Sequence, residues 1–238
     1  MSKDIVTASN FNLAMVVSDR PTEGAMVEGQ DSAGSVSRLA MYQGTAQEEQ
    51  MYGNAFKRGE FIDALEKRRI GPAFSGKEAP KIRVVPITGF TTWSRWQKGA
   101  KIPDYVFKNK NQVPPADLEW TDGPNGQRNP PAASEAVNLI VLVDGEPWPM
   151  LLVLKRTGIS AFHKVIAPME RRHGHSVYEL SSEDDKNAAG QAYKRMTARF
   201  VVRSDDATLE AVRSVKAQLS AVMAQVQAME EKEDDCPI

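Results

Sequence analysis

Residues 137–155, VNLIVLVDGEPWPMLLVLK, carry the strongest strand signal in this chain. Two apolar runs, Val137–Val143 and Pro149–Lys155, flank Asp144 and Gly145, a pair of residues typical of a β-hairpin turn. Both runs are apolar at nearly every position, whereas a strand with one solvent-exposed face would alternate between apolar and polar residues. The stretch therefore predicts a hairpin that is covered on both faces or closed into a barrel.

More strands are predicted on both sides of this hairpin, from runs of β-branched and aromatic residues. They are Ile82–Ile87, Thr91–Gln97, Ser176–Leu180 and Ala192–Val202. Gly89 suggests a tight bend or hairpin between the first two. A helix over residues 187–196 is the alternative for part of the last one. The stretch 108–133 is rich in Pro, Asn, Gly and Asp, which predicts a long loop that carries Trp120.

Helical spacing of apolar residues marks four other segments. They are Glu48–Phe56, Phe61–Arg69, Ala161–Arg172 and Ala207–Glu231. Pro168 makes the third helix short or irregular. In the fourth, apolar residues alternate three and four positions apart. This spacing suits a coiled-coil seam over residues 209–229 that joins two copies of the chain, or a helix packed on the core of its own chain.

The order of these elements predicts a mainly β fold with added helices, in the α+β class. A strand pair, a long loop, a second pair, a helix and a third pair match the layout of an OB-fold, a Greek-key barrel that binds oligonucleotides. We expect five regions: a disordered arm (1–36), a helical extension (37–80), an OB-like nucleic-acid-binding domain (81–204), a C-terminal helix (205–231) and an acidic tail (232–238).

Composition points to a soluble protein of the cytoplasm. No apolar run approaches the ~20 residues that a membrane helix needs, and the single cysteine, Cys236, has no partner for a disulfide. The overall charge of −1 hides an asymmetry, because residues 81–204 carry a net charge of +6 and residues 205–238 one of −5. A basic middle with an acidic end suits a polyanion binder.

Aromatic and basic residues are interleaved over residues 90–110. This pattern is typical of proteins that bind single-stranded nucleic acid. Bases stack on aromatic faces while Lys and Arg follow the phosphates. The candidates for nucleic-acid contact here are Trp93, Arg95, Trp96, Lys98, Lys101, Tyr105 and Phe107. Because successive strand residues face opposite sides, one tryptophan is expected to be a core residue.

Two further groups of candidates lie later in the chain. Lys155 and Arg156 follow the hairpin, and Tyr193, Arg195 and Arg199 share one face of the last predicted strand. The alternative for each group is a solvated surface without a ligand.

Signals for catalysis are weak. We find no phosphate-binding glycine loop, nucleophile turn or set of metal ligands. The sequence therefore predicts a protein that is not an enzyme and needs no cofactor or metal. Glu183, Asp184 and Asp185 are interpreted as part of a polar loop.

The chain ends in EEKEDDCPI, acidic residues followed by proline and one apolar residue. Such an end stays solvated and offers a small apolar hook beside the terminal carboxylate, which a basic pocket of another protein can bind. We expect Pro237 and Ile238 to make the specific contact and Asp234 and Asp235 to steer the partner. This end resembles the tail of single-stranded DNA-binding proteins.

Three internal stretches carry a second resemblance: Arg38–Phe61, the block from Val85 to Trp96, and Asn187–Tyr193. They resemble early-region bacteriophage proteins, several of which are taken to be single-stranded DNA-binding proteins with an OB-fold. The resemblance implies a role in phage DNA replication or recombination, with replication or recombination proteins recruited through the tail.

The expected function is therefore sequence-independent binding of single-stranded DNA by base stacking and phosphate contacts. The alternative is a protein-interaction or virion-associated adaptor that binds no nucleic acid and no membrane.

Deletion of residues 233–238 should leave the affinity for DNA equal or higher while it abolishes recruitment of the partner protein. The reason is that the tail's carboxylates repel phosphates and contribute only to the protein contact. Titration of full-length and truncated protein with an oligonucleotide checks this, and a lower DNA affinity of the truncated chain would contradict the role given to the tail.

Overall fold

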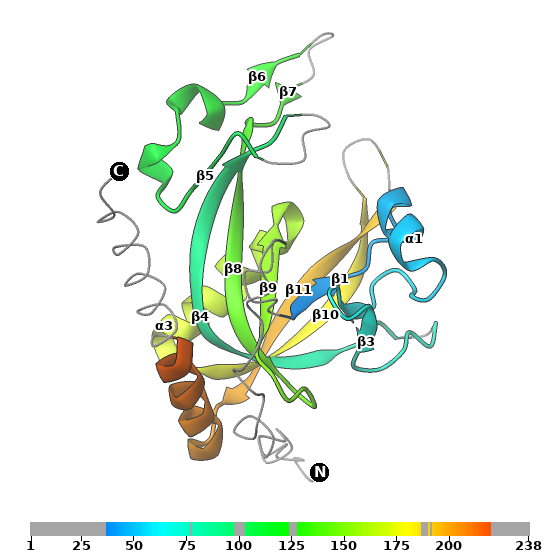
Figure 1. The fold of residues 1–238 in the computed structure, drawn as a ribbon, viewed down its shortest axis with the longest axis vertical. Helices are drawn as coiled ribbons and strands as arrows, with labels where there is room; N and C mark the ends of the chain where they lie inside the picture. Colours follow the sequence, from blue (N-terminus) through cyan, green and yellow to red (C-terminus); the bar gives the residue numbers. More distant parts are fainter. Residues whose placement is uncertain are drawn as a thin grey trace, which may run out of the picture.

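The computed structural model describes residues 37–76, 78–97, 103–123, 128–186, 190 and 192–219. Its main feature is a large sheet that is strongly curled, like half of a barrel (Figure 1). The strands of this sheet are β1 (Arg38–Met41), β2 (Phe61–Asp63), β3 (Arg68–Ile70), β4 (Ile82–Arg95), β5 (Tyr105–Phe107), β8 (Ala133–Val143), β9 (Met150–Lys155), β10 (Ser176–Lys186) and β11 (Ala192–Arg203). The mainly β class is confirmed.

The strands are ordered β11-β10-β4-β8-β9-β1-β2-β3, and β5 also pairs with β4. All neighbours are antiparallel except β1 and β9, which are parallel. An OB-fold is a five-stranded barrel, so this longer, half-open sheet does not confirm the predicted barrel type.

Both faces of the β8–β9 hairpin are covered, as its apolar sequence predicts. Val137, Leu139 and Val141 of β8 belong to a core cluster on one face, together with Ile166 of a covering helix. Leu142, from the other face of the same strand, packs in a second cluster with residues of the C-terminal helix. The turn includes Gly145, whose φ of +79° suits glycine.

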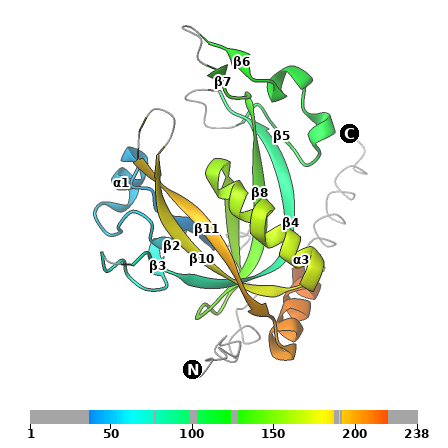
Figure 2. The ribbon, with the colours of Figure 1, turned by 180° about the vertical axis from the view of Figure 1, so that it is seen from behind.

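The helix on the first face runs through α2 (Ile159–Ala161), a π-helical turn η7 (Phe162–Ile166) and α3 (Ala167–His173), and it follows a short 3₁₀ turn, η6 (Arg156–Gly158). Figure 2 shows it lying over the curled sheet. Pro168 has no N–H to donate to the preceding turn, and it lies just after the π-helical turn, where the hydrogen-bond pattern of the helix is irregular. The predicted irregular helix is confirmed.

The C-terminal helix spans residues 206–219 within the described part of the chain. It begins after Asp205, whose Oδ1 accepts a hydrogen bond from the Thr208 N–H at 2.8 Å. Val212 and Val215 are buried against the sheet and Leu219 packs beside them. These seam residues therefore contact the protein's own core; residues 220–231, the tail and the N-terminal arm (1–36) lie outside the described residues.

The prediction of a helical extension over residues 37–80 is only partly right. The helix α1 (Ala46–Tyr52) is present with a capping box between Thr45 and Glu48. The predicted helix over Phe61–Arg69 is wrong, because β2 and β3 form a hairpin there. The Asp63 carboxylate accepts hydrogen bonds from the Leu65 and Glu66 N–H groups, which closes a turn instead of a helix.

The prediction of a bend at Gly89 is also wrong, because β4 runs unbroken past it. A Cβ at this position would lie 2.5 Å from Leu139 Cδ2 and 3.1 Å from the Asn138 carbonyl oxygen on β8. Glycine is needed for the close approach of the two curled strands. A bulge between Pro86 and Thr88 adds to the curl.

The acidic residues 183–185 lie in strand β10 and not in a loop. They stand opposite the basic residues of β11, where Glu183 pairs with Arg195 and Asp184 with Lys194. Cross-strand charge pairs of this kind stabilise an antiparallel ladder. The strand prediction for Ala192–Val202 is confirmed over the alternative helix.

The predicted long loop over residues 108–133 contains only short elements. They are η3 (Lys110–Gln112), η4 (Pro115–Leu118) and a small hairpin of β6 (Thr121–Asp122) and β7 (Arg128–Asn129), which projects from one end of the molecule (Figure 1). None of the helices in the described ranges is long and apolar enough to cross a lipid bilayer.

Replacement of Gly89 by alanine should lower the free energy of unfolding by about 1–3 kcal/mol, because the new methyl group overpacks the contact with Leu139. Gly158→Ala is a matched control, since its Cβ would lie 3.5 Å from the nearest atom, Leu154 Cδ2, an ordinary contact. Urea unfolding of both variants checks this. Equal stability of the two would show that β4 does not need glycine at this point.

Candidate nucleic-acid interface

A groove of about 910 Å³ lies where β4 and β9 end and β8 begins. It is lined by Trp96, by Pro130 and Pro131, and by Lys155 and Arg156. We call it the Trp96 groove. The structure thus brings together one predicted tryptophan and two predicted cations that are 59 and 60 residues away from it in the sequence.

The sheet register explains why these residues meet. Arg95, next to Trp96, pairs with Ala133 at the start of β8, and Lys155 at the end of β9 pairs with Ala136 of the same strand. The termini of three neighbouring strands therefore lie at one end of the sheet.

Trp96 is the aromatic residue that this groove presents to solvent. Its side chain is held by a hydrogen bond from Nε1 to Ser94 Oγ at 3.2 Å, and the residue is 49% exposed. An indole that is oriented yet half exposed is suited to stack on a base.

The cations of the groove belong to a cluster of Arg38, Lys155 and Arg156. Burial, then the positive charges of Arg38 and Arg156, lower the pKa of Lys155. None of the three forms a salt bridge with a carboxylate in the described part of the chain. One carboxylate, Glu135, also lines the groove and lies 3.5 Å from His163 Nε2. The groove therefore has an excess of positive charge, from Lys155 and Arg156 against Glu135, that an anion would stabilise.

Arg38 was not predicted from the sequence, and no local signal could have identified it. It enters the cluster because β1 pairs in parallel with β9, with Arg38 opposite Leu151. A second hollow of about 350 Å³ is lined by Arg38 and shares Lys155 with the Trp96 groove. Lys155 thus joins the two hollows, each of which also has one carboxylate in its lining, Glu48 in the second hollow and Glu135 in the Trp96 groove.

Arg156 adopts a left-handed backbone conformation, with φ at +48°. This conformation is uncommon for residues other than glycine and stores strain. The strained residue ends β9 and begins η6, so it redirects the chain at the groove. Strain of this kind is concentrated at functional sites.

Arg95, Tyr105 and Phe107 do not line the groove. The Arg95 guanidinium contacts Asp117 at 2.9 Å and Asp104 at 3.3 Å, and the Tyr105 hydroxyl donates to Asp117 at 2.8 Å. Burial and the bond to Asp117 raise the pKa of Tyr105 to about 12. The rings of Tyr105 and Phe107 stack at 4.6 Å, so this cluster holds the loop 103–118 on the sheet.

Trp93 lies in the same region but in a different setting. Lys110 Nζ is 5.4 Å from its ring centroid, and Phe107 is its register partner on β5. Trp93 is therefore partly covered by the loop, but neither it nor Trp96 is buried, so the expectation that one of them is a core residue is wrong. Trp120 is more open, 56% exposed, with the Arg128 guanidinium 6.0 Å from its ring.

The candidate residues on β11 form ion pairs or hydrogen bonds with carboxylates. Arg195 contacts Glu183 at 3.0 Å and Asp185 at 3.3 Å, and Arg199 contacts Glu179 at 3.1 Å. The Tyr193 hydroxyl donates to Asp185. Compensated charges attract phosphate weakly, and none of these three residues lines the Trp96 groove.

The remaining candidates, Lys98, Lys101 and the tail residues Asp234, Asp235, Pro237 and Ile238, lie outside the described residues.

Within the described ranges, no group of three or more His, Cys, Asp or Glu residues could hold a metal ion. His175 Nδ1 lies 2.7 Å from the Pro86 carbonyl oxygen, and His173 Nδ1 contacts Arg203.

Comparisons with known proteins find no relative from which a role could be taken. No protein-family model matches this chain, and neither a search of curated proteins nor one of solved structures finds a match.

Arg156→Gln should raise the pKa of Lys155 toward its ordinary value, because it removes one of the two cations that oppose protonation. Arg38→Gln should act in the same direction and more strongly, since Arg38 contributes more to the shift. The rate of acylation of the Lys155 amine as a function of pH, followed by peptide mass spectrometry, reports this pKa. An unchanged pKa of Lys155 in both variants would show that Arg38 and Arg156 do not act on it as one charge cluster.

Proposed function

We propose that this protein binds single-stranded DNA without regard to sequence, with the Trp96 groove as the principal contact surface. The observation that supports it is the combination in one groove of an oriented, half-exposed indole and two cations, Lys155 and Arg156, that outnumber the one carboxylate of the lining, Glu135, and form no salt bridge within the described residues. Stacking surfaces beside phosphate contacts are what a single strand requires.

In this proposal, a base stacks on Trp96 while the sugar–phosphate chain passes Lys155 and Arg156 toward Arg38. Arg156 can offer a planar, two-pronged contact to a phosphate, and Lys155 a point charge. Phosphate binding would offset the repulsion among the three cations. The strain at Arg156 fits this role, since it fixes the direction of a functional side chain.

A duplex suits the groove less well than a single strand. Its bases are already stacked on each other, so Trp96 could stack on one only at a helix end. An OB-fold binds an oligonucleotide on an exposed sheet face and its loops, whereas the surface proposed here lies at the ends of β4 and β9 and the start of β8.

The wider role that we propose is that of a binding protein, not an enzyme, in phage DNA replication or recombination. Support for this part comes from the sequence resemblances and from the acidic tail, which would recruit partner proteins through Pro237 and Ile238.

Oligo-dT should quench the tryptophan emission of the protein and bind with an affinity that falls steeply with salt. Trp96→Ala should weaken binding by about 1–3 kcal/mol, the contribution of one stacked base. The double variant Lys155→Gln with Arg156→Gln should also reduce the slope of log K against log salt by roughly 0.7 for each phosphate that it no longer binds. Fluorescence titration over a salt series measures all three.

Arg213→Gln is a control that also removes a positive charge, because this exposed side chain lies on the C-terminal helix and pairs with Glu210 at 3.1 Å. It should bind like the wild type. The proposal fails if oligo-dT leaves the emission unchanged at low salt, or if the control weakens binding as much as loss of Lys155 and Arg156 does.

A further inference from the structure

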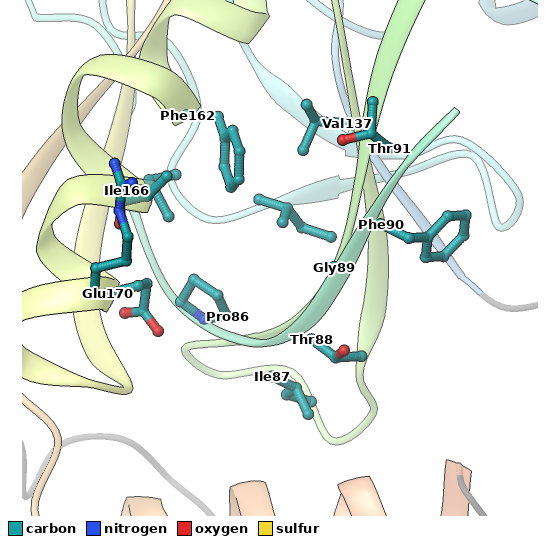
Figure 3. A pocket seen from close by; sticks show the side chains of 13 residues that line it. Pro86, Ile87, Thr88, Gly89, Phe90, Thr91, Val137, Phe162, Ile166 and Glu170 are labelled. Atoms are coloured by element: carbon teal, nitrogen blue, oxygen red, sulfur yellow. The ribbon is translucent and has the colours of Figure 1, made fainter. Parts of the chain in front are cut away.

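A second hollow, which we call the Glu170 pocket, has a volume of about 310 Å³ and lies between the sheet and its covering helix (Figure 3). Its apolar lining includes Phe162 and Ile166 from the helix and Val137 and Leu139 from β8. Glu170 lies at one end, beside Pro86. An apolar hollow with one convergent acceptor is the usual form of a small ligand site.

The Glu170 carboxylate uses only one of its oxygens within the described structure. Oε1 accepts hydrogen bonds from the Tyr178 hydroxyl at 2.8 Å and from the Ser176 N–H at 3.1 Å. The nearest donor to Oε2 is His175 Nδ1 at 3.7 Å, which is beyond hydrogen-bond length and is 2.7 Å from the Pro86 carbonyl oxygen. Oε2 can therefore accept a hydrogen bond from a ligand.

Burial raises the pKa of Glu170, although the bond from Tyr178 and the proximity of His175 oppose the rise. A carboxylate in this state is incompletely stabilised by its surroundings. An N–H donor placed against Oε2 would supply the missing interaction.

The Glu170 pocket and the Trp96 groove lie along one path between β8 and the helix. Glu135 of β8 and Ile159 of the helix line the groove, while Val137 and Phe162 line the pocket. Two residues along a strand span about 7 Å. Glu170 lies farther along this path, beside Pro86 (Figure 3), which pairs with Val141, six residues or about 20 Å along β8 from Glu135. A bound strand that continues from the groove can therefore place a base against Glu170 several nucleotides beyond the one on Trp96.

We infer that the Glu170 pocket takes one base of the bound strand, and that this base carries an exocyclic amino group: adenine, cytosine or guanine. The inference rests on the proposed function. A base turned out of its stack is commonly held by apolar walls and hydrogen bonds to its edge. Arg171 also lines the pocket and is exposed, so its guanidinium can contact a phosphate of that nucleotide.

The carboxylate decides which base is accepted. Glutamate accepts hydrogen bonds from amino groups such as N4 of cytosine. Thymine offers only its N3–H, and the carbonyl oxygens on either side of that group would face the carboxylate and repel it. Binding is then independent of sequence along the groove and selective at one position.

The test compares oligo-dC with oligo-dT of equal length on the full chain at constant salt. The wild type should bind oligo-dC at least about fivefold more tightly, the lower end of one good base contact. Glu170→Gln should abolish this preference, because the amide nitrogen that replaces Oε2 donates to a thymine carbonyl oxygen and cannot accept a hydrogen bond from the cytosine amino group. Its amide oxygen can still accept from Tyr178 and Ser176, so the fold is retained, which thermal unfolding verifies.

Ala167→Leu is a second variant that narrows the pocket without touching Glu170, since Ala167 lines it. It should likewise bring oligo-dC binding to the level of oligo-dT. Equal binding of both oligonucleotides by the wild type, or a preference that survives in both variants, overturns the inference while the proposed function stands. If neither oligonucleotide binds the wild type at low salt, the proposed function itself is overturned.

Discussion

The close approach of β4 and β8 is the contact on which the rest of the structure depends. The two strands pair along nearly their whole length, and Gly89 lets Leu139 lie directly against the backbone of β4. With the bulge after Pro86, this contact curls the sheet into a half-barrel instead of a flat layer. A curled sheet of apolar strands must be covered on both faces, and one helix covers each face.

The same curl creates the two hollows. The helix over residues 159–173 lies against the sheet but does not fill the space between β4, β8 and its own surface, which leaves the Glu170 pocket. At the end of the sheet, where the helix begins, the strand termini surround the Trp96 groove. Both sites are built on rigid strands and a packed helix, which keeps their side chains in place for a ligand.

Local pairing, and not the total charge, decides which cations are available. Residues 81–204 carry a net charge of +6, yet Arg95, Arg195 and Arg199 are each held by carboxylates. Lys155 and Arg156 have no such partner among the described residues, and they are joined by Arg38 from outside that range. An exposed ion pair contributes little to stability, but it strongly reduces the attraction of its cation for a phosphate.

The sequence by itself determined the features that depend on neighbours along the chain. These are the β8–β9 hairpin with two covered faces, the irregular helix around Pro168, the strand β11 and the helix after Asp205, each of which follows from periodicity or turn chemistry. Only the tertiary structure decided that Phe61–Arg69 forms strands, that Gly89 is a contact point and not a bend, and that Arg38 joins Lys155 and Arg156. No sequence pattern identified the Glu170 carboxylate as a hydrogen-bond acceptor in a pocket. These features depend on contacts between residues far apart in the chain, such as the parallel pairing of β1 with β9, and no local pattern of residues encodes such a contact.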